Sequence, residues 1–414
     1  MFQSIKINSW RQFDNVEIIF HPRLTIITGA NGSGKTTILN LLSQHLGWHT
    51  QFVSTPKKDN KTGIIKFFSD LWGRLFENKQ ETDNSLHEAC KIIYSNGKEC
   101  SMKINNVVSP TFSFTLYDNQ VIKGFHIPSH RPIYNYQAVT NIPTQLKTKH
   151  SVFQICNQSY LNRYLGNSSQ PTENFLIKET LISLATFGYG NQAIIKNDEA
   201  IKLYEGFENI LKIVLPPKLG FKRFEIRMPE VILETTTGDF SLDAVSGGIA
   251  SIIGLAWQIY MFADGSNPFT ITFDEPENHL HPEMQRTLLP NFLAAFPQIQ
   301  FIVSSHNPFI ISSVPDSKVY VLNYTNNNSI NSLLLENIEK SGTANDILRN
   351  VLGLETTMPD WVVSKLESII SKYTHCGITS VNLDAFKAEL KSVGLDKYVP
   401  TTIANLIEKN KKND

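Results

Sequence analysis

The chain has 414 residues, and its 38 lysines and arginines balance 38 aspartates and glutamates, so the formal net charge is zero. At roughly 100–200 residues per domain, this length predicts two or three domains, or one large domain with insertions. A balanced charge disfavours a protein that coats nucleic acid through a general lysine excess, although a local basic groove stays possible. The four cysteines include no C-x-x-C pair, which excludes a zinc ribbon or disulfide scaffold and favours a reducing cytoplasm.

The hydropathy pattern does not indicate a membrane protein. Residues 1–6 lack the charged-then-apolar pattern of a secretory signal. The longest largely apolar stretch runs from Ile249 to Ala263, is interrupted by Ser251 and Gln258, and is shorter than the about 18–20 residues that span a bilayer. We therefore expect a buried helix there, a cytoplasmic protein and no membrane partner.

Strand and helix patterns follow one another along the chain. Residues 5–7 and 16–20 predict antiparallel strands, and the β-branched run 24–28 predicts a strand buried on both faces, before helical spacing begins at 37–42. Asn96-Gly97 predicts the turn of a hairpin over 91–104. Residues from about 146 to 217 predict a helical insertion, and strands at 221–227 and 231–236 precede alternating strands and helices up to about residue 324. Beyond residue 326 we expect mostly helix.

A phosphate-binding loop is the strongest motif. Residues 29–36, G-A-N-G-S-G-K-T, match G-x-x-x-x-G-K-[ST] in full, after a strand and at the start of a helix. Glycines there admit left-handed backbone angles, so successive amides converge on phosphates at a helix N-terminus. Lys35 is expected to reach the β and γ phosphates of ATP, and the Thr36 hydroxyl to ligate Mg²⁺. A glycine-rich turn without a ligand is the alternative.

Two acids end the strand predicted at 269–273. Asp274 is expected to hold Mg²⁺ through water, and Glu275 to polarise the attacking water. A structural acidic turn is the alternative, which the phosphate loop in the same chain disfavours.

Two weaker motifs complete the series. Ser246-Gly247-Gly248 precedes the apolar helix. Serine and glycine cap many helices, so the motif alone is weak. A helix N-terminus with two glycines is, however, a second anion-binding site, and one nucleotide in one subunit needs only the first. We therefore expect it to bind the γ-phosphate of ATP on a neighbouring subunit. His306 follows another apolar strand and is expected to donate to the γ-phosphate or the attacking water, the alternative being a structural histidine.

The ordered motifs GANGSGKT, VSGG, TITFDEPENHLHP and VSSHNP resemble those of ATP-binding-cassette (ABC) ATPases. More narrowly, the chain is similar to the soluble branch that contains RecF, the SMC proteins and the overcoming-lysogenisation-defect (OLD) family, and DEPENHLHP is most similar to OLD-type ATPases. The resemblance implies an α/β fold: a P-loop NTPase with an ABC-type ATPase head, an antiparallel β-subdomain, the helical insertion and a C-terminal helical appendage. It implies an ATPase domain at 1–325 and the appendage at 326–414.

The resemblance also implies roles for individual residues. Lys35, Glu275 and His306 are implied to be catalytic, and Ser246, Gly247 and Gly248 to form the signature motif that acts across a dimer. Thr36, Asp274 and Gln137 are implied to serve the Mg²⁺, with Gln137 as the Q-loop residue; an ordinary surface glutamine is the alternative. The implied ATP-binding residues are Arg11 of the opening motif, Asn31, Gly32, Ser33, Gly34, Lys35, Thr36 and Thr37.

The chain departs from the OLD nucleases, whose additional nuclease domain needs an Asp-x-Asp pair. No such pair occurs here, so we expect no nuclease domain of its own. The layout resembles stand-alone ATPases of the Septu and PARIS phage-defence systems, which implies a homodimer or larger oligomer and a separately encoded effector such as a nuclease or toxin. The alternatives are a RecF-like DNA clamp, although the charge does not indicate DNA binding, and an ATP-bound scaffold with little turnover.

Other polar clusters have simpler interpretations. His279 and His281 are spaced H-x-H without an evident third ligand, so we expect them to shape their loop rather than to hold a metal. The scattered lysines at 57–58, 218 and 222 are expected to form solvated surface.

Overall fold

The computed structural model describes residues 1–58, 63, 65–69, 87–104, 109–130, 136–145, 147–164, 171–336, 340, 342–354, 356, 358–374 and 380–395. Its contacts divide the chain into two units, Met1–Leu352 and Gly353–Asp414.

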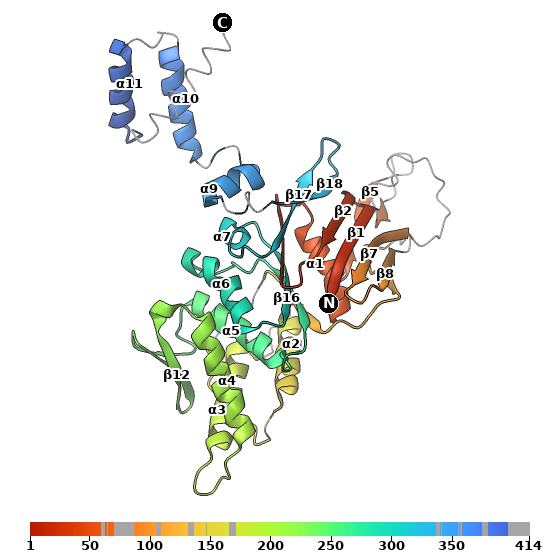
Figure 1. Ribbon diagram of the computed structural model, residues 1–414, viewed down its shortest axis with the longest axis vertical. Coiled ribbons are helices and arrows are strands. Elements are labelled where there is room, and N and C mark those ends of the chain that lie inside the picture. The colour runs from red at the N-terminus through yellow and green to blue at the C-terminus, as the bar shows by residue number, and fades with distance from the viewer. Residues whose placement is uncertain are drawn as a thin grey trace. The chain divides into compact units, whose positions relative to one another are not determined.

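The first unit contains one large mixed sheet (Figure 1). Its strands are β1 (Phe2–Trp10), β2 (Phe13–Ile19), β3 (Leu24–Gly29), β7 (His87–Tyr94), β8 (Glu99–Ile104), β10 (Thr115–Tyr117), β11 (Gly124–Ile127), β15 (Phe269–Asp274), β16 (Ile299–Ser304), β17 (Lys318–Tyr324) and β18 (Ile330–Leu334). In the described residues this 11-stranded sheet has the order β10-β8-β7-β1-β2-β18-β17-β3-β16-β15-β11. Neighbours from β17 to β11 are parallel, whereas those from β10 to β2 are antiparallel.

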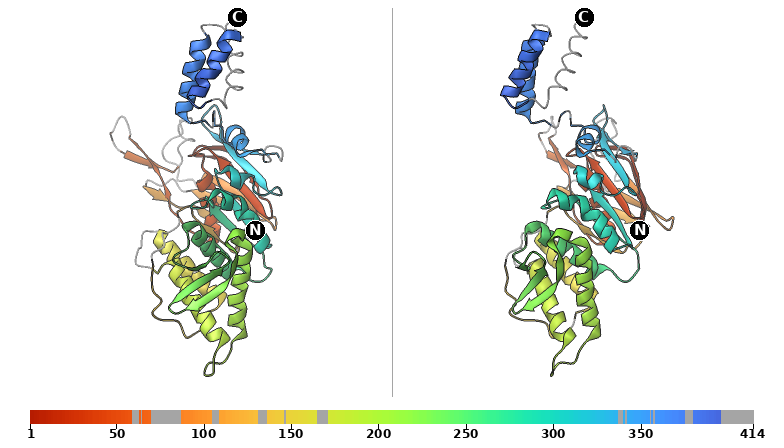
Figure 2. Two further views of the ribbon diagram at one scale, coloured as in Figure 1. Left: turned by 90° about the vertical axis from the view of Figure 1, so that its left-hand side faces the viewer. Right: turned by 60° about the vertical axis from the view of Figure 1, so that its left-hand side comes forward.

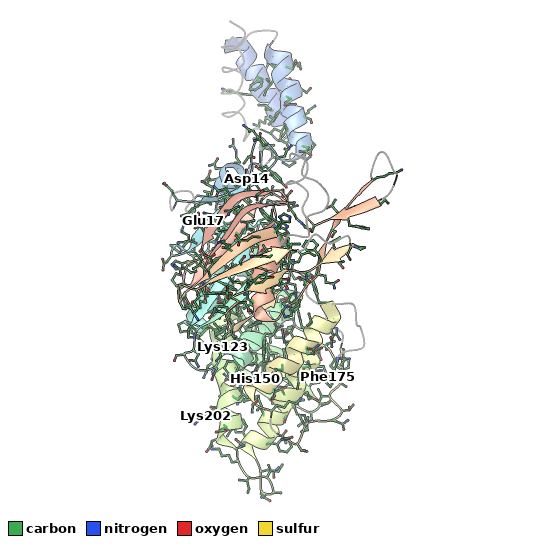
Figure 3. All side chains as sticks on the ribbon, turned by 90° about the vertical axis from the view of Figure 1, so that its right-hand side faces the viewer. Asp14, Glu17, Lys123, His150, Phe175 and Lys202 are labelled. Atoms are coloured by element: carbon green, nitrogen blue, oxygen red, sulfur yellow. The ribbon has the colours of Figure 1, made fainter. Side chains whose placement is uncertain are left out.

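The burial of each strand follows its sequence pattern. Every residue of β3, β15 and β16 is buried, as expected for parallel strands that are covered on both faces. In β2 the side chains alternate: Val16 and Ile18 are buried, whereas Asp14 and Glu17 lie at the surface (Figure 3). The predicted hairpin is present as β7 and β8, in which Ile92 pairs with Cys100.

Helices cover the parallel half of the sheet and extend into a helical lobe. Helix α1 (Lys35–Ser43) packs on β3, β15 and β16. The lobe, seen from further sides in Figure 2, contains α2 (Lys149–Tyr164), α3 (Glu173–Tyr189), α4 (Asp198–Val214), α5 (Gly247–Phe262) and a small sheet of β12 (Phe221–Arg227), β13 (Glu230–Thr235) and β14 (Asp239–Ser241). Further helices of the first unit are α6 (Pro282–Ala295), α7 (Pro308–Ile311) and α9 (Ala344–Asp346). Two pairs of short strands lie outside the large sheet: β4 (Phe52–Val53) pairs with β9 (Thr111–Phe112), and β5 (Thr55–Lys58) pairs with β6 (Ile65–Phe68).

Helix α5 contains the predicted apolar stretch and is buried over most of its length, against α2, α3 and α4. A helix that is surrounded by protein is apolar all round, which explains its continuous hydrophobic sequence. Within the described ranges, no helix combines the length and apolarity needed to cross a membrane.

The division between the two units differs from the boundary expected after residue 325. Residues 330–334 form β18, which pairs with β17 and meets β2 where Ile330 is opposite Phe13. This strand therefore belongs to the sheet, and the first unit continues to Leu352. The second unit contains α10 (Asp360–Thr374) and α11 (Ser380–Ser392), with an apolar contact between them that includes Leu366 and Leu390.

A buried histidine predicts a pH-dependent stability. His126 is 4% exposed, its Nδ1 lies 2.9 Å from the Thr272 hydroxyl oxygen, and burial lowers its pKa to about 3. Between that pKa and about 6.5 the unfolded chain binds a proton that the folded chain does not, so this contribution to the free energy of unfolding decreases as the pH falls, by up to ~1.4 kcal/mol per pH unit. Chemical denaturation between about pH 6.5 and 4.5 should therefore show a larger loss of stability for the wild type than for His126→Gln.

The comparison isolates His126 because all other titrating groups are common to both proteins. These include the buried carboxyl groups whose pKa is raised by burial, Asp274, Glu277 and Glu208, which act in the opposite direction. Equal pH dependences for the two proteins would contradict the prediction.

Candidate nucleotide-binding and catalytic site

Three neighbouring parallel strands bring the predicted site residues together. In the order β3-β16-β15, each strand ends at the same edge of the sheet: β3 leads into the phosphate-binding loop, β15 ends at Asp274 and β16 ends at Ser304. Motifs that are far apart in the sequence, at 29–36, 274–275 and 304–306, therefore meet at one place. This is the crevice at the carboxyl ends of the strands where open α/β sheets bind their ligands.

The phosphate-binding loop has the backbone that its glycines permit. Gly32 and Gly34 have φ values of 81° and 87°, in the left-handed region that favours glycine. Lys35 is buried, and its ammonium group donates to the carbonyl oxygens of Gly29 at 2.8 Å and Ala30 at 3.0 Å. Burial lowers the pKa of Lys35, while the nearby carboxylates of Glu275 and Asp274 act to raise it.

Asp274 connects the three strand ends. Its Oδ2 accepts a hydrogen bond of 2.9 Å from the Thr36 hydroxyl, and its Oδ1 accepts one from the Ser304 hydroxyl. Burial raises the pKa of Asp274, and these two hydrogen bonds oppose that rise. A carboxylate beside a hydroxyl is an oxygen donor set of the kind that Mg²⁺ prefers, so Thr36 and Asp274 fit the predicted metal.

Glu275 and His306 face each other beside this pair. His306 Nδ1 lies 3.6 Å from Glu275 Oε1, and the other carboxylate oxygen of Glu275 accepts a hydrogen bond of 3.0 Å from Asn278 Nδ2. Glu275 has a φ of 48°, which is unusual for a residue with a side chain, and its amide donates to the Ser304 carbonyl at 3.0 Å. Such backbone strain is concentrated at functional sites, because surrounding contacts must maintain it.

The signature segment lies at the N-terminus of α5. Ser246 is the N-cap residue, is exposed, and makes no capping hydrogen bond through its side chain. A Cβ atom on Gly247 would meet open space, whereas one on Gly248 would lie 3.2 Å from the His279 carbonyl oxygen. Among the described contacts, none joins Ser246 to the phosphate-binding loop of its own chain.

Arg11 and Gln137 make other contacts than those expected. The Arg11 guanidinium donates to the Val53 carbonyl at 2.6 Å and lies 5.0 Å from the Trp10 ring centroid. The neighbouring Gln12 contacts the phosphate-binding loop by donating to the Gly32 carbonyl at 2.7 Å.

Gln137 contacts the helical lobe, since its Oε1 accepts hydrogen bonds from the amide and hydroxyl of Thr172 at 2.9 and 3.1 Å. The roles of Arg11 at the phosphates and of Gln137 at the metal stay predictions.

The H-x-H pair lies between β15 and the start of α6. The His281 ring accepts a hydrogen bond from the Glu283 amide and so caps α6, while His279 has a φ of 69°. In the part of the chain that the structure describes, no group of three or more histidine, cysteine or acidic residues could hold a metal ion. Sequence reasoning missed several polar residues of the site, although most lie within the quoted motifs: Gln12, Glu277, Asn278, Ser304 and Ser305.

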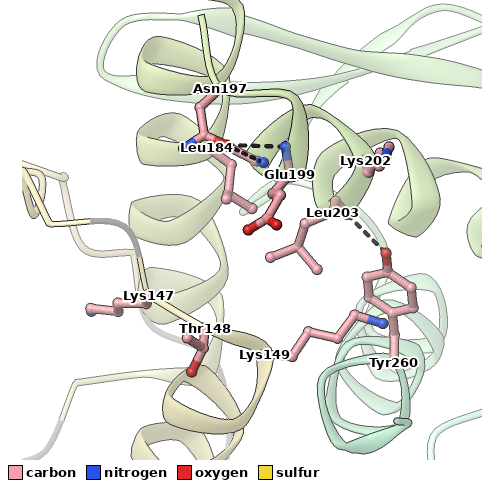
Figure 4. Close-up of a pocket in the computed structure, with 10 residues that line it drawn as sticks. Lys147, Thr148, Lys149, Leu184, Asn197, Glu199, Lys202, Leu203 and Tyr260 are labelled. Atoms are coloured by element: carbon pink, nitrogen blue, oxygen red, sulfur yellow. Dashed lines mark hydrogen bonds between the residues drawn. The ribbon is translucent and has the colours of Figure 1, made fainter. Parts of the chain in front are cut away.

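A separate cavity of about 560 Å³ lies in the helical lobe (Figure 4). The Lys149 ammonium lies 3.7 Å from the ring centroid of Tyr260, and the Tyr260 hydroxyl donates to the Leu203 carbonyl. The charges around it largely offset one another, because Glu199 lies among the lining lysines and Lys147 pairs with Glu179 at 2.9 Å.

Comparison with known proteins identifies the family. Residues 49–311 match the family model described as "AAA ATPase domain", and residues 2–47 match one described as "P-loop containing region of AAA domain". The chain belongs to the AAA ATPase domain family. This AAA ATPase is similar to the "Retron Vc95 probable ATPase" of Vibrio cholerae, with 26% identity over 383 residues that cover 78% of this chain and 73% of that protein. It is also similar to the "Septu protein PtuA" of Bacillus thuringiensis, with 20% identity, 86% of this chain and 85% of that protein.

Among solved structures, the SMC head domain from Thermotoga maritima aligns with a TM-score of 0.43 and 14% identity, covering 81% of this chain and 99% of that one. The sequence matches confirm the predicted P-loop ATPase and its resemblance to Septu ATPases, and they add a similarity to retron ATPases that the sequence analysis did not predict. They support ATPase function for this AAA ATPase.

A matched pair of glycine substitutions tests the phosphate-binding loop. Gly34 and Gly47 both have positive φ, but a Cβ on Gly34 would overlap the Phe13 ring, whereas one on Gly47 would meet no atom within 4 Å. Gly34→Ala should therefore abolish the rise in melting temperature on addition of ATP and Mg²⁺, because the loop cannot keep its conformation. Gly47→Ala should lose only about 1–2 kcal/mol of stability and keep the full ATP effect. Equal ATP effects in the two variants would contradict this assignment.

Proposed function

We propose that this protein is an ATPase subunit that dimerises, or forms a larger oligomer, when it binds ATP, and that gates a separately encoded effector such as a nuclease or toxin in antiviral defence. The observation that carries the proposal is the exposed N-terminus of α5, where Ser246 makes no capping bond and Gly247 adjoins open space. Helix N-termini attract phosphate groups, and this one is on the surface where a neighbouring subunit can approach.

Within one subunit, the phosphate-binding loop binds ATP. Lys35 exchanges its bonds with the carbonyls of Gly29 and Ala30 for phosphate oxygens, which are stronger, charged partners. Thr36 and Asp274 would hold Mg²⁺, which would supply positive charge that offsets the charge of the phosphate oxygens. The loop amides and Lys35 thus orient the γ-phosphate towards Glu275.

Glu275 and His306 serve the hydrolytic step. Glu275 accepts a hydrogen bond from the attacking water and aligns it with the γ-phosphorus, while Asn278 holds its second carboxylate oxygen. His306, 3.6 Å from Glu275, donates towards the γ-phosphate. In the proposed dimer each ATP lies between Lys35 of one subunit and the α5 N-terminus of the other, so hydrolysis opens the interface and changes what the effector contacts.

Similarity to Septu PtuA and to a retron ATPase supports the proposed role in antiviral defence. Septu PtuA and the retron ATPase are matched over most of their length, and neither match reaches 30% identity.

A Glu275→Gln variant tests the proposed dimer. It removes the group that polarises water but keeps the loop that binds ATP, so ATP should be bound and retained. Light scattering should then show at least a doubling of mass with ATP and Mg²⁺, and Ser246→Arg in the same background should prevent it. A variant that retains ATP and stays monomeric would exclude the cross-subunit role of Ser246.

A Lys35→Ala variant tests the defence role. Loss of the buried ammonium removes its phosphate contacts, so the variant should give no ATP hydrolysis and no protection of cells against phage, without slowing growth. Lys98→Ala, in the exposed turn after β7, serves as the control and should protect as the wild type does.

The wild-type chain should also co-purify with the product of a neighbouring gene. Tight, ATP-dependent binding of duplex DNA by the chain alone would instead favour a DNA clamp.

A further inference from the structure

Glu277 is a buried acidic residue of the DEPENHLHP segment that the proposed chemistry does not use. Its side chain is 5% exposed, and its Oε1 accepts a hydrogen bond of 2.7 Å from the Ser305 hydroxyl. Its Oε2 is buried and has no hydrogen-bond partner in the described part of the chain. A half-satisfied buried carboxyl group is destabilising, so its presence beside Glu275 calls for a compensating role.

A chain of hydrogen bonds begins at Glu277 and surrounds His306. Ser305, which donates to Glu277, also accepts a bond of 3.0 Å from the Asn307 amide. The Asn307 side chain then donates to Gln285 Oε1 at 2.9 Å, and Gln285 donates to the Leu280 carbonyl at 2.9 Å. Ser305 is therefore attached to the segment that follows β15, and Asn307 is attached to the first turns of α6.

The His306 side chain itself is 52% exposed, so packing restrains it little. Its position relative to Glu275 depends on the backbone of residues 305–307. That backbone is held by the side-chain bonds of Ser305 and Asn307 together with the bond of 3.1 Å from the Ser305 amide to the Ile27 carbonyl. We propose that Glu277 is a positioning residue that, through Ser305, fixes the turn that presents His306 to Glu275. This inference rests on the proposed hydrolytic role of Glu275 and His306.

The role requires a hydrogen-bond acceptor and no charge. Burial raises the pKa of Glu277, which favours the neutral carboxyl form, and the bond from Ser305 needs only a carbonyl-type oxygen. A glutamine has such an oxygen at the same reach, whereas an alanine has none. Glu277→Gln should therefore preserve the turn and Glu277→Ala should release it.

Steady-state ATP hydrolysis separates these variants. Glu277→Ala should lower kcat about tenfold, the factor that corresponds to the loss of one buried hydrogen bond, while KM for ATP changes less than about twofold. Glu277→Gln should keep kcat within about threefold of the wild type. Glu283→Gln is the control, because Glu283 is an exposed glutamate of α6 with 61% side-chain exposure, and it should match the wild type. A wild-type kcat in Glu277→Ala, or an equal loss in Glu277→Gln, would overturn the proposal.

A second series shows whether Glu277 acts through the His306 turn. In a His306→Ala background, Glu277→Ala should lower kcat by less than about twofold, since its effect is already lost. A further tenfold loss there would overturn the role. If Glu277→Ala does not fold, Ser305→Ala removes the same hydrogen bond from the other side and should show the same loss of kcat; wild-type kcat in Ser305→Ala would overturn it as well. A wild-type chain without ATPase activity would overturn the proposed function together with this inference, whereas an active wild type with unaltered variants overturns this inference alone.

Discussion

The hydrogen bonds of the buried Asp274 carboxylate are the interaction on which the site depends. This one side chain at the end of β15 accepts from Thr36, at the start of α1, and from Ser304, at the end of β16. It joins the phosphate-binding loop, the acidic strand end and the histidine turn, and it does so because β3, β16 and β15 are neighbours in the parallel sheet. A strand order that separated these three strands would leave the same motifs apart.

Burial shifts the pKa values of the charged side chains in this site. Lys35, Asp274 and Glu277 are all buried, and for each of them burial is the leading cause of a pKa shift towards the neutral form. Hydrogen bonds offset part of this cost of burial: carbonyl oxygens accept from Lys35, and hydroxyl groups donate to Asp274 and Glu277. Dipoles and charges that are fixed before the ligand arrives need little reorganisation during reaction, which is the physical basis of electrostatic catalysis.

Local patterns made the strands and the phosphate-binding loop predictable from the sequence, because a strand, a glycine loop and a helix start are specified by adjacent residues. The alternation in β2, the buried run of β3 and the loop at 29–36 were all of this kind. The boundary at residue 325 was not, because β18 joins the sheet only through a pairing in which Ile330 meets Phe13. The contacts of Gln12 with Gly32 and of Arg11 with Val53 likewise depend on which loops become neighbours, a property that no short motif encodes.

The segment between β15 and α6 has contacts at both of its ends that bear on the proposed dimer. Near one end, Glu275 faces His306; near the other, the His279 carbonyl lies against Gly248 at the start of α5. Two residues of this segment, Glu275 and His279, have positive φ, a strained conformation that surrounding contacts must maintain. If the start of α5 binds the ATP of the neighbouring subunit, a change at Glu275 reaches that second nucleotide through only a few residues of packed backbone. Hydrolysis of one ATP then changes how the α5 N-terminus of the same subunit binds the second ATP. The two nucleotide sites of the proposed dimer should therefore be coupled.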